Sequence, residues 1–248
     1  MLNRQSRASN LLHIEYNYKE AVSIHRSSLF FLLSVFYPVT AYYLYTINAH
    51  FSEIRKRQFG KMKYLIVGLG NIGAEYANTR HNIGFIVAEA LAKDLGVTFT
   101  TDRYASRAET KLKGRSVVII KPSTYMNLSG KAYKYWLNAE KAEISNSLVL
   151  VDDIDLDTGL LRLKTKGSGG SHNGLNHIIE TLGHTDFPRL RIGIGKDFAR
   201  GFQVEYVLGR FTSQEEKIFM EKIPQAVEMI KSFILSGPSI TMNSFNNK

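Results

Sequence analysis

The sequence predicts an α/β protein: a single three-layer domain with a twisted mixed β-sheet flanked by helices, plus an atypical N-terminal extension. From Met62 onward, short apolar runs alternate with helical patterns, which is typical of α/β domains. Lys113-Gly114 separates two strand-like runs and predicts an antiparallel hairpin, so the sheet is expected to be mixed. A composition that is 44% hydrophobic and 22% charged is ordinary for a globular protein with a substantial core.

The strands are predicted where short apolar runs rich in β-branched residues stand between turn signals. In chain order they cover residues 64–67, 108–111, 116–121, 148–151, 160–164 and 190–194. The helices follow the helical spacing of apolar residues, at 83–95, 129–139, 174–182 and 213–235. The last one opens with Ser213-Gln214-Glu215-Glu216, which we interpret as a capping box, and Pro224 is expected to break or kink it.

Residues 1–61 differ from the rest of the chain. They include nineteen consecutive residues without a charge, 29–47, which is long enough to span a bilayer. Three explanations stay open: a misassigned start or dispensable leader, which we favour, a membrane anchor, and a signal peptide. The long segment before the apolar run argues against the signal peptide, and Pro38 with four tyrosines weakens the anchor. We expect residues 62–248 to form the functional domain, with membrane association only if 29–47 is a genuine anchor.

The charge of the chain favours a polyanionic partner. The formal net charge is +10, and surplus Lys and Arg raise affinity for phosphate backbones through counterion release. Half of this excess belongs to residues 1–61, so the basic balance of the predicted domain is milder than the total suggests. The chain has no cysteine, and its seven histidines show neither HxxxH nor HExxH spacing. We therefore expect no metal and no other cofactor.

A glycine motif follows the first predicted strand. Residues 68–73 have the GxGxxG spacing of a dinucleotide-binding loop, which raises the hypothesis of an NAD-dependent oxidoreductase. That loop requires a helix directly after the glycines and an acidic residue at the end of the next strand. Here the next helix begins ten residues later, at Ile83, and Glu89 lies inside it. The polar loop that intervenes contains Asn71, Tyr76 and His81, which is typical of a catalytic site.

Polar residues also follow the strands predicted at 116–121 and 148–151. Because active sites in open α/β sheets form at the carboxyl ends of strands, we expect Asp152 to lie near His81. A carboxylate bonded to one imidazole nitrogen fixes the tautomer and leaves the other nitrogen free to take a proton from water. For Asp153 and Asp157 we favour a solvated turn. No serine or cysteine occupies a nucleophile elbow, so direct attack by water is the chemistry that fits.

A second glycine-rich segment, 164–175, lacks the order of a P-loop. With Lys164 and Lys166 at its start and a helix after it, it could hold phosphates, or it could be a flexible loop with Asn173 as N-cap. Arg189 and Arg191 alternate along a strand and share one face, where they could bind phosphates or be solvated.

Together these segments resemble the bacterial-type peptidyl-tRNA hydrolase family. The resemblance rests on LIVGLGN at 65–71, Tyr76, TRHNIG at 79–84, PSTYMNLSG at 122–130, DDID at 152–155, GGSHNGL at 169–175 and RLRIGIG at 189–195. The match runs in order from Met62 almost to the end of the chain, whereas residues 1–61 have no counterpart in the typical family pattern. This difference favours the misassigned start.

The resemblance implies an esterase that releases the peptide from peptidyl-tRNA dropped prematurely by ribosomes, in the cytoplasm, as a monomer without a cofactor. It implies that His81 is the general base and that Asp152 holds it in its basic form. It also implies that Asn71 contacts the peptide near the ester and helps the enzyme prefer N-blocked aminoacyl-tRNA over free aminoacyl-tRNA. Further residues would bind the peptide and the terminal adenosine (Tyr76, Tyr125, Asn127, Asn173) or tRNA phosphates (Lys164, Arg191). The alternative is a non-catalytic RNA-binding protein of the same fold. Loss of Asn71, His81 or Asp152 would have favoured it, but all three are present.

Overall fold

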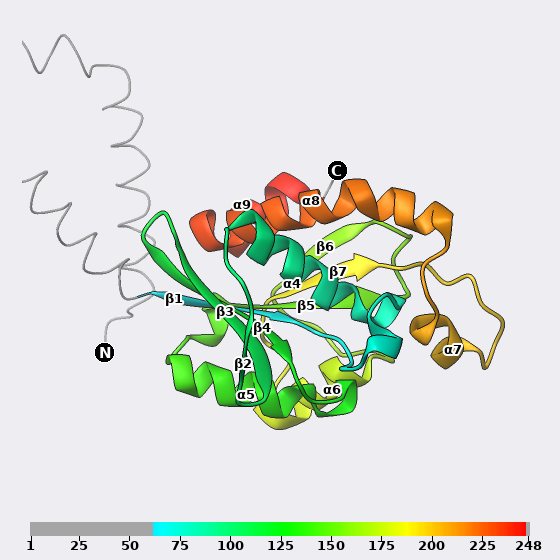
Figure 1. Cartoon of the computed structure of the whole chain (residues 1–248), viewed down its shortest axis with the longest axis horizontal. Helices are drawn as coiled ribbons and strands as arrows, with labels where there is room; N and C mark the ends of the chain where they lie inside the picture. Colours follow the sequence, from blue (N-terminus) through cyan, green and yellow to red (C-terminus); the bar gives the residue numbers. More distant parts are fainter. Residues whose placement is uncertain (1–61, 247–248) are drawn as a thin grey trace, which may run out of the picture. The chain divides into compact units, whose positions relative to one another are not determined.

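The computed structural model describes residues 62–246, in which one seven-stranded sheet lies between two layers of helices (Figure 1). The strand order is β2-β3-β4-β1-β5-β7-β6. The strands are β1 (Lys63–Gly68), β2 (Thr100–Asp102), β3 (Ala105–Leu112), β4 (Arg115–Pro122), β5 (Ser147–Asp153), β6 (Leu161–Lys164) and β7 (Arg189–Gly193). The central strands β4, β1, β5 and β7 are parallel, while β2, β3 and β6 add antiparallel edges. The predicted three-layer α/β fold with a mixed sheet is therefore confirmed.

The helices divide between the two faces of the sheet. Figure 1 shows α4, α8 and α9 above it and α5 and α6 below it. Their bounds are α4 (Ile83–Asp94), α5 (Ser129–Glu140), α6 (Asn173–Leu182), α7 (Gln203–Leu208), α8 (Ser213–Ser236) and α9 (Pro238–Phe245). Within the described residues, none of these helices combines the length and the apolarity that a membrane span requires. The apolar stretch 29–47, and with it the predicted extension 1–61, lies outside the described residues.

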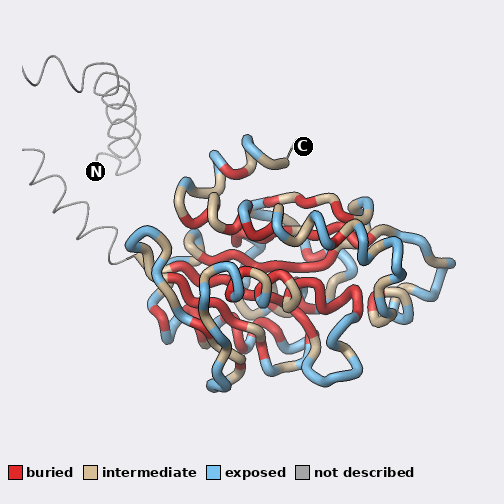
Figure 2. The backbone as a smooth tube through the Cα atoms, turned by 45° about the horizontal axis from the view of Figure 1, so that its top comes forward, coloured by how far each residue is buried: buried red, intermediate tan, exposed pale blue. Residues whose placement is uncertain are grey.

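The core has two parts because alternate residues of each strand point to opposite faces. Ile66, Leu148 and Leu150 pack with α4 and α8, whereas Leu65 and Val149 pack with α5 and α6. The central strands are covered on both faces, so they consist of continuous apolar residues rather than alternating ones. Figure 2 shows the result as a buried central layer between partly exposed helices.

Apart from short 3-10 helices, one strand and two α-helices of the described residues were not predicted: β2, α7 and α9. The three residues of β2 are polar and exposed, so they carry no apolar pattern, and α7 is a helix of only six residues. Two details of α8 also differ from expectation. The capping box is formed by Thr212 with Glu215, one residue earlier than predicted. The helix continues through Pro224 without the expected break, because the turns after it bury residues such as Met229 and Phe233 in the core.

The first glycine motif allows α4 to approach the sheet closely. A Cβ at Gly68 would lie 2.4 Å from the carbonyl oxygen of Gly84, and a Cβ at Gly84 would lie 2.5 Å from that of Leu150. No side chain fits between these backbones. Gly68 and Gly84 therefore serve the packing of α4 against the sheet.

We expect the substitution Gly84→Ala to lower the free energy of unfolding by about 1 to 3 kcal/mol, because overpacking forces the backbones apart. Chemical denaturation followed by circular dichroism measures this change. Lys93→Ala, at the exposed end of α4, is the control and should leave the free energy of unfolding nearly unchanged. A Gly84→Ala variant as stable as the parent would show that helix and sheet can separate without cost.

Candidate active site

A pocket of about 640 Å³ opens at the carboxyl ends of the parallel strands. Its walls come from the loops after β1, β4, β5 and β6 and from α7. Of the nine residues to which the resemblance gives a role, eight line it: Asn71, His81, Tyr125, Asn127, Asp152, Lys164, Asn173 and Arg191. Tyr76 is the exception, since this residue of the short helix η1 (Ala74–Tyr76) does not line the pocket.

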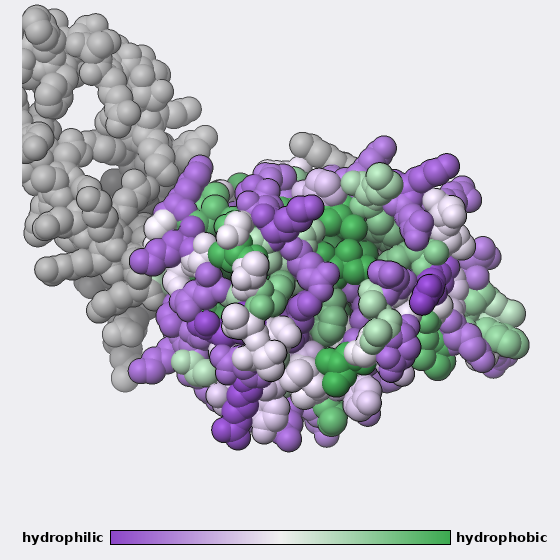
Figure 3. Space-filling model, viewed as in Figure 1, coloured by the Kyte–Doolittle hydropathy of each residue, from purple (hydrophilic) through white to green (hydrophobic). Residues whose placement is uncertain are grey.

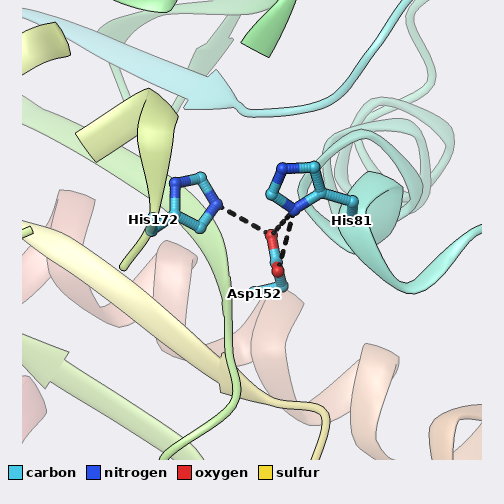
Figure 4. Close-up of side chains that lie close together, drawn as sticks. All are labelled: His81, Asp152 and His172. Carbon is cyan, nitrogen blue, oxygen red and sulfur yellow. Dashed lines mark hydrogen bonds and ion pairs between the residues drawn. The ribbon is translucent and has the colours of Figure 1, made fainter. Parts of the chain in front are cut away.

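His81 and Asp152 form the centre of this pocket. His81 lies in the short helix η2 (Arg80–Asn82), and Asp152 is near the end of β5, with only 4% of its surface exposed. The Nδ1 atom of His81 lies 3.0 Å from both carboxylate oxygens (Figure 4). A carboxylate accepts hydrogen bonds, so Nδ1 holds the proton and Nε2 keeps a free lone pair. The expected orientation of the imidazole by Asp152 is therefore present.

A second histidine, His172, completes the group. Its Nε2 lies 2.9 Å from Oδ1 of Asp152, so both imidazoles point at one carboxylate (Figure 4). Its Nδ1 accepts hydrogen bonds from the backbone amides of Gly174 and Leu175, at 3.1 and 3.2 Å. Because Nδ1 accepts, Nε2 must carry the proton that it donates to Asp152. His172 is also the N-cap of α6, in place of Asn173, which is the first residue of the helix.

The role of His172 was not predicted from the sequence. Histidine is not a common N-cap, and asparagine, which is, follows directly. The available signal was a histidine just before a helix that begins at the same sheet edge as Asp152.

The electrostatics of the group follow from this geometry. Burial alone would raise the pKa of Asp152, but the two histidines outweigh it and hold the pKa of this carboxyl well below its usual range. Burial acts on His81 in the opposite sense and would lower its pKa, yet the charge of Asp152 and their hydrogen bond raise the pKa of His81 above its ordinary value. The pair therefore keeps Asp152 ionised and strengthens His81 as a base.

The three side chains also resemble a metal site, since the candidate ligand atoms of His81, Asp152 and His172 lie within 4.8 Å of one another. A metal-bound imidazole must offer a lone pair to the ion. Nε2 of His172 cannot do so while the amides of Gly174 and Leu175 occupy the lone pair of Nδ1. These three side chains are thus better suited to the hydrogen bonds that the two imidazoles donate to Asp152 than to binding a metal ion.

Asn71 reaches the pocket with a fixed orientation. Its Oδ1 accepts a hydrogen bond from the amide of Met126 at 2.8 Å, and its backbone exchanges two hydrogen bonds with the side chain of Asn82. This network assigns Nδ2 as the free end of the amide. Within residues 62–246, Nδ2 has no partner, so it can donate to a bound molecule.

The loop that carries His81 is anchored by the residue before it. Arg80 donates two hydrogen bonds of 2.8 Å to the carboxylate of Glu215 on α8 and one of 3.1 Å to the carbonyl of Tyr206 on α7. The guanidinium lies 4.3 Å from the centre of the Tyr206 ring, and the backbone amide of Arg80 donates to Gly209. We call the Arg80, Glu215 and Tyr206 contacts the Arg80 clamp. They fix the position of η2 relative to two helices that are distant in sequence.

The two arginines of β7 have different surroundings. Arg189 is buried and donates hydrogen bonds to the backbone carbonyls of Ser168 and Thr185, so it anchors the glycine-rich loop. The expectation that it faces solvent or phosphates is therefore wrong. Arg191 is partly exposed and pairs with Asp153, whose other oxygen accepts the amide of Asp155. Asp153 was expected in a solvated turn, and its side chain also forms an ion pair with Arg191.

An open α/β sheet with a carboxylate-oriented histidine at its carboxyl edge defines the class: an α/β protein with the site of a general-base hydrolase. The family model that matches residues 65–248 is described as peptidyl-tRNA hydrolase. Among similar proteins, the peptidyl-tRNA hydrolase of Phocaeicola vulgatus is 56% identical over 187 residues, which cover 75% of this chain and 100% of the relative. That of Bacteroides fragilis is 53% identical over the same length and coverage.

The chain belongs to the peptidyl-tRNA hydrolase family, as its motifs predicted. A solved structure agrees: the peptidyl-tRNA hydrolase of Acinetobacter baumannii superposes with a TM-score of 0.71 at 35% identity, covering 76% of this chain and 96% of that one. The predicted enzyme is thereby confirmed, and the opening glycine motif does not mark an oxidoreductase.

Proposed function

We propose that this chain hydrolyses the ester between peptide and tRNA in peptidyl-tRNA, with water as nucleophile and His81 as general base. The observation that carries the mechanism is the hydrogen bond between Nδ1 of His81 and the buried Asp152, which leaves Nε2 free inside the pocket. A non-catalytic RNA-binding protein would not need a carboxylate buried between two imidazoles, since burying it is costly.

The reaction has two proton transfers. Nε2 of His81 takes a proton from water as the oxygen attacks the ester carbonyl, and Nδ2 of Asn71 donates to the substrate beside it. The charge of Asp152 stabilises the resulting imidazolium, and the proton donated by His172 keeps Asp152 ionised while this happens. The imidazolium then returns its proton to the ribose oxygen that leaves. The products are a peptide with a free carboxylate and a tRNA with a free terminal ribose hydroxyl.

The rest of the pocket suits the two ends of this substrate. Tyr125 is 57% exposed and offers a flat apolar surface at the rim, and Asn127 and Asn173 supply amides to the peptide or the terminal adenosine. Lys164 and Arg191 also line the pocket and bind phosphates of the tRNA. Tyr76, which does not line the pocket, would contact only substrate that extends past its rim. We further propose that the enzyme acts as a monomer, in the cytoplasm and without a metal, and that residues 62–248 suffice.

The test compares two substrates. Purified full-length protein and residues 62–248 are each incubated with N-acetylaminoacyl-tRNA and with unblocked aminoacyl-tRNA, after treatment with a chelator. We expect rapid cleavage of the blocked substrate only, at equal rates for both proteins. Cleavage of both substrates would remove the proposed role of Asn71 near the peptide, and loss of activity in residues 62–248 would assign a function to residues 1–61.

A further inference from the structure

A second groove, of about 550 Å³, lies on the layer formed by α5 and α6. It combines cations with aromatic rings and is lined by Arg103, Tyr104, Leu128, Lys131, Lys134, Tyr135, Asn138, His177 and Thr181. In Figure 3, hydrophilic and paler side chains are mixed on the surface over β2 and α5. We call it the α5 groove. Neither the proposed reaction nor the residues singled out from the sequence involve it.

The turn that forms one wall of the α5 groove is rigidly held. Tyr104 has φ of 62°, a left-handed conformation that residues other than glycine rarely adopt. Its carbonyl accepts the amide of Ser123 at 2.8 Å, and the carbonyl of Arg103 accepts Nε1 of Trp136 at 3.0 Å. These two bonds hold the turn and present both side chains at the surface. A strained backbone conformation persists only where the surrounding structure stabilises it, and such residues are common at binding sites.

Two of the three cations of this groove lie near aromatic rings. The guanidinium of Arg103 lies 5.2 Å from the ring centre of Tyr104 and 5.4 Å from that of Tyr135, and Nζ of Lys131 lies 5.1 Å from Tyr104. Lys134 donates a hydrogen bond to the carbonyl of Thr181, at 3.4 Å. Among the residues that the structure describes, no Asp or Glu lines the groove, and Arg103, Lys131 and Lys134 form no ion pair. Three positive charges are therefore left for an anion.

The α5 groove and the catalytic pocket lie at the same edge of the sheet. Ala105 pairs with Pro122, so the turn at Arg103 and Tyr104 lies beside the carboxyl end of β4. The loop that follows β4 lines both sites, with Tyr125 and Asn127 on the catalytic pocket and Leu128 on the α5 groove. A large molecule whose end enters the catalytic pocket can reach the groove.

We infer that the α5 groove binds the phosphodiester backbone of the tRNA body outside its terminal nucleotides, an inference that rests on the proposed function. Peptidyl-tRNA offers two occupants, the peptide and the RNA. Only the RNA always carries the regularly spaced negative charges that three unpaired cations attract. The exposed tyrosine rings add flat surfaces against which a ribose or a base packs. The groove thus supplements the phosphate contacts proposed for Lys164 and Arg191, which line the catalytic pocket and not the groove.

The test removes two of the charges. Lys131 and Lys134 are exposed residues of α5, and glutamine keeps the helix propensity, so K131Q/K134Q should fold. We expect KM for N-acetylaminoacyl-tRNA to rise about tenfold with kcat unchanged. The slope of log KM against log salt concentration should become shallower by about 2, because two fewer phosphates are neutralised by the protein. For a short substrate, N-acetylaminoacyl ester on a CCA trinucleotide, KM should equal that of the parent.

The matched control is K93Q/K111Q, which removes the same amount of positive charge near the amino-terminal ends of the parallel strands, away from both sites. It should leave KM for both substrates unchanged. An equal rise in KM for the control would assign the effect to net charge and overturn the inference, as would an unchanged KM in K131Q/K134Q. A rise that depends on peptide length and persists on the trinucleotide would assign the groove to the peptide.

Failure of the proposed hydrolase function can be distinguished from failure of the groove inference. If the parent protein cleaves neither substrate, the hydrolase proposal fails. The groove is then tested by the binding of deacylated tRNA, measured by fluorescence anisotropy. Tighter binding by the parent than by K131Q/K134Q would support the groove, and equal binding would overturn it.

Discussion

Alanine in place of His81 is expected to lower kcat for N-acetylaminoacyl-tRNA by about 10²- to 10⁴-fold, the usual contribution of a general base. Nε2 is the only ring nitrogen of His81 that points away from Asp152, and its loss leaves water without an acceptor for its proton. Affinity for the tRNA should stay close to that of the parent, since the phosphate contacts that we propose lie elsewhere. Steady-state kinetics and tRNA binding separate the two quantities.

His184→Ala is the control for this variant, because His184 is an exposed histidine outside the pocket lining. It should retain the kinetics of the parent. Normal turnover by the His81→Ala variant would refute His81 as the base, and a loss of tRNA affinity equal to the loss of kcat would show that His81 serves binding.

Asparagine in place of Asp152 should also lower the maximal rate by about 10²- to 10⁴-fold. Asparagine replaces one of the two carboxylate oxygens that Nδ1 of His81 contacts with an NH2 group, which donates instead of accepting, so the tautomer of His81 is no longer fixed. It also lacks the charge that stabilises the imidazolium. Asp94→Asn, on the distant end of α4, is the control and should keep the parent rate.

The pH dependence gives Asp152→Asn a second readout. The base must be neutral to act, so kcat/KM falls as the pH drops below the pKa of His81. In the parent, the charge of Asp152 raises this pKa, so the acid limb should lie above the ordinary value for histidine, about 6.5. Removing the charge leaves burial, which lowers the pKa, and the acid limb should move to lower pH. An acid limb that stays in place would mean that another group titrates.

The sheet and its catalytic edge could be predicted because their signals are local. Continuous apolar runs mark the central strands, and polar residues such as Asp152 directly follow them. That His81 meets this carboxylate follows from the rule that parallel strands end at one edge. The resemblance of the motifs supplied the substrate, which the chemistry of an imidazole and a carboxylate does not specify.

What could not be predicted depends on contacts distant in sequence. His172 caps a helix and bonds Asp152 at once, and only the folded chain shows that a cap and a catalytic contact coincide. Arg189 has the pattern of a surface cation on an alternating strand, yet its partners are backbone carbonyls of a folded loop. Polar β2 gives no periodic signal, although its turn carries Arg103 and Tyr104.

The Arg80 clamp has a consequence for the order in which the protein is made. Glu215 is encoded 134 residues after His81 in a chain that leaves the ribosome from its N-terminus, so the loop of the base lacks its anchor until α8 has emerged. A growing chain is itself a peptidyl-tRNA, attached to the kind of ester that the finished enzyme cleaves. The clamp thus couples the position of the base to the synthesis of nearly the whole chain, although α8 itself lines no part of the pocket.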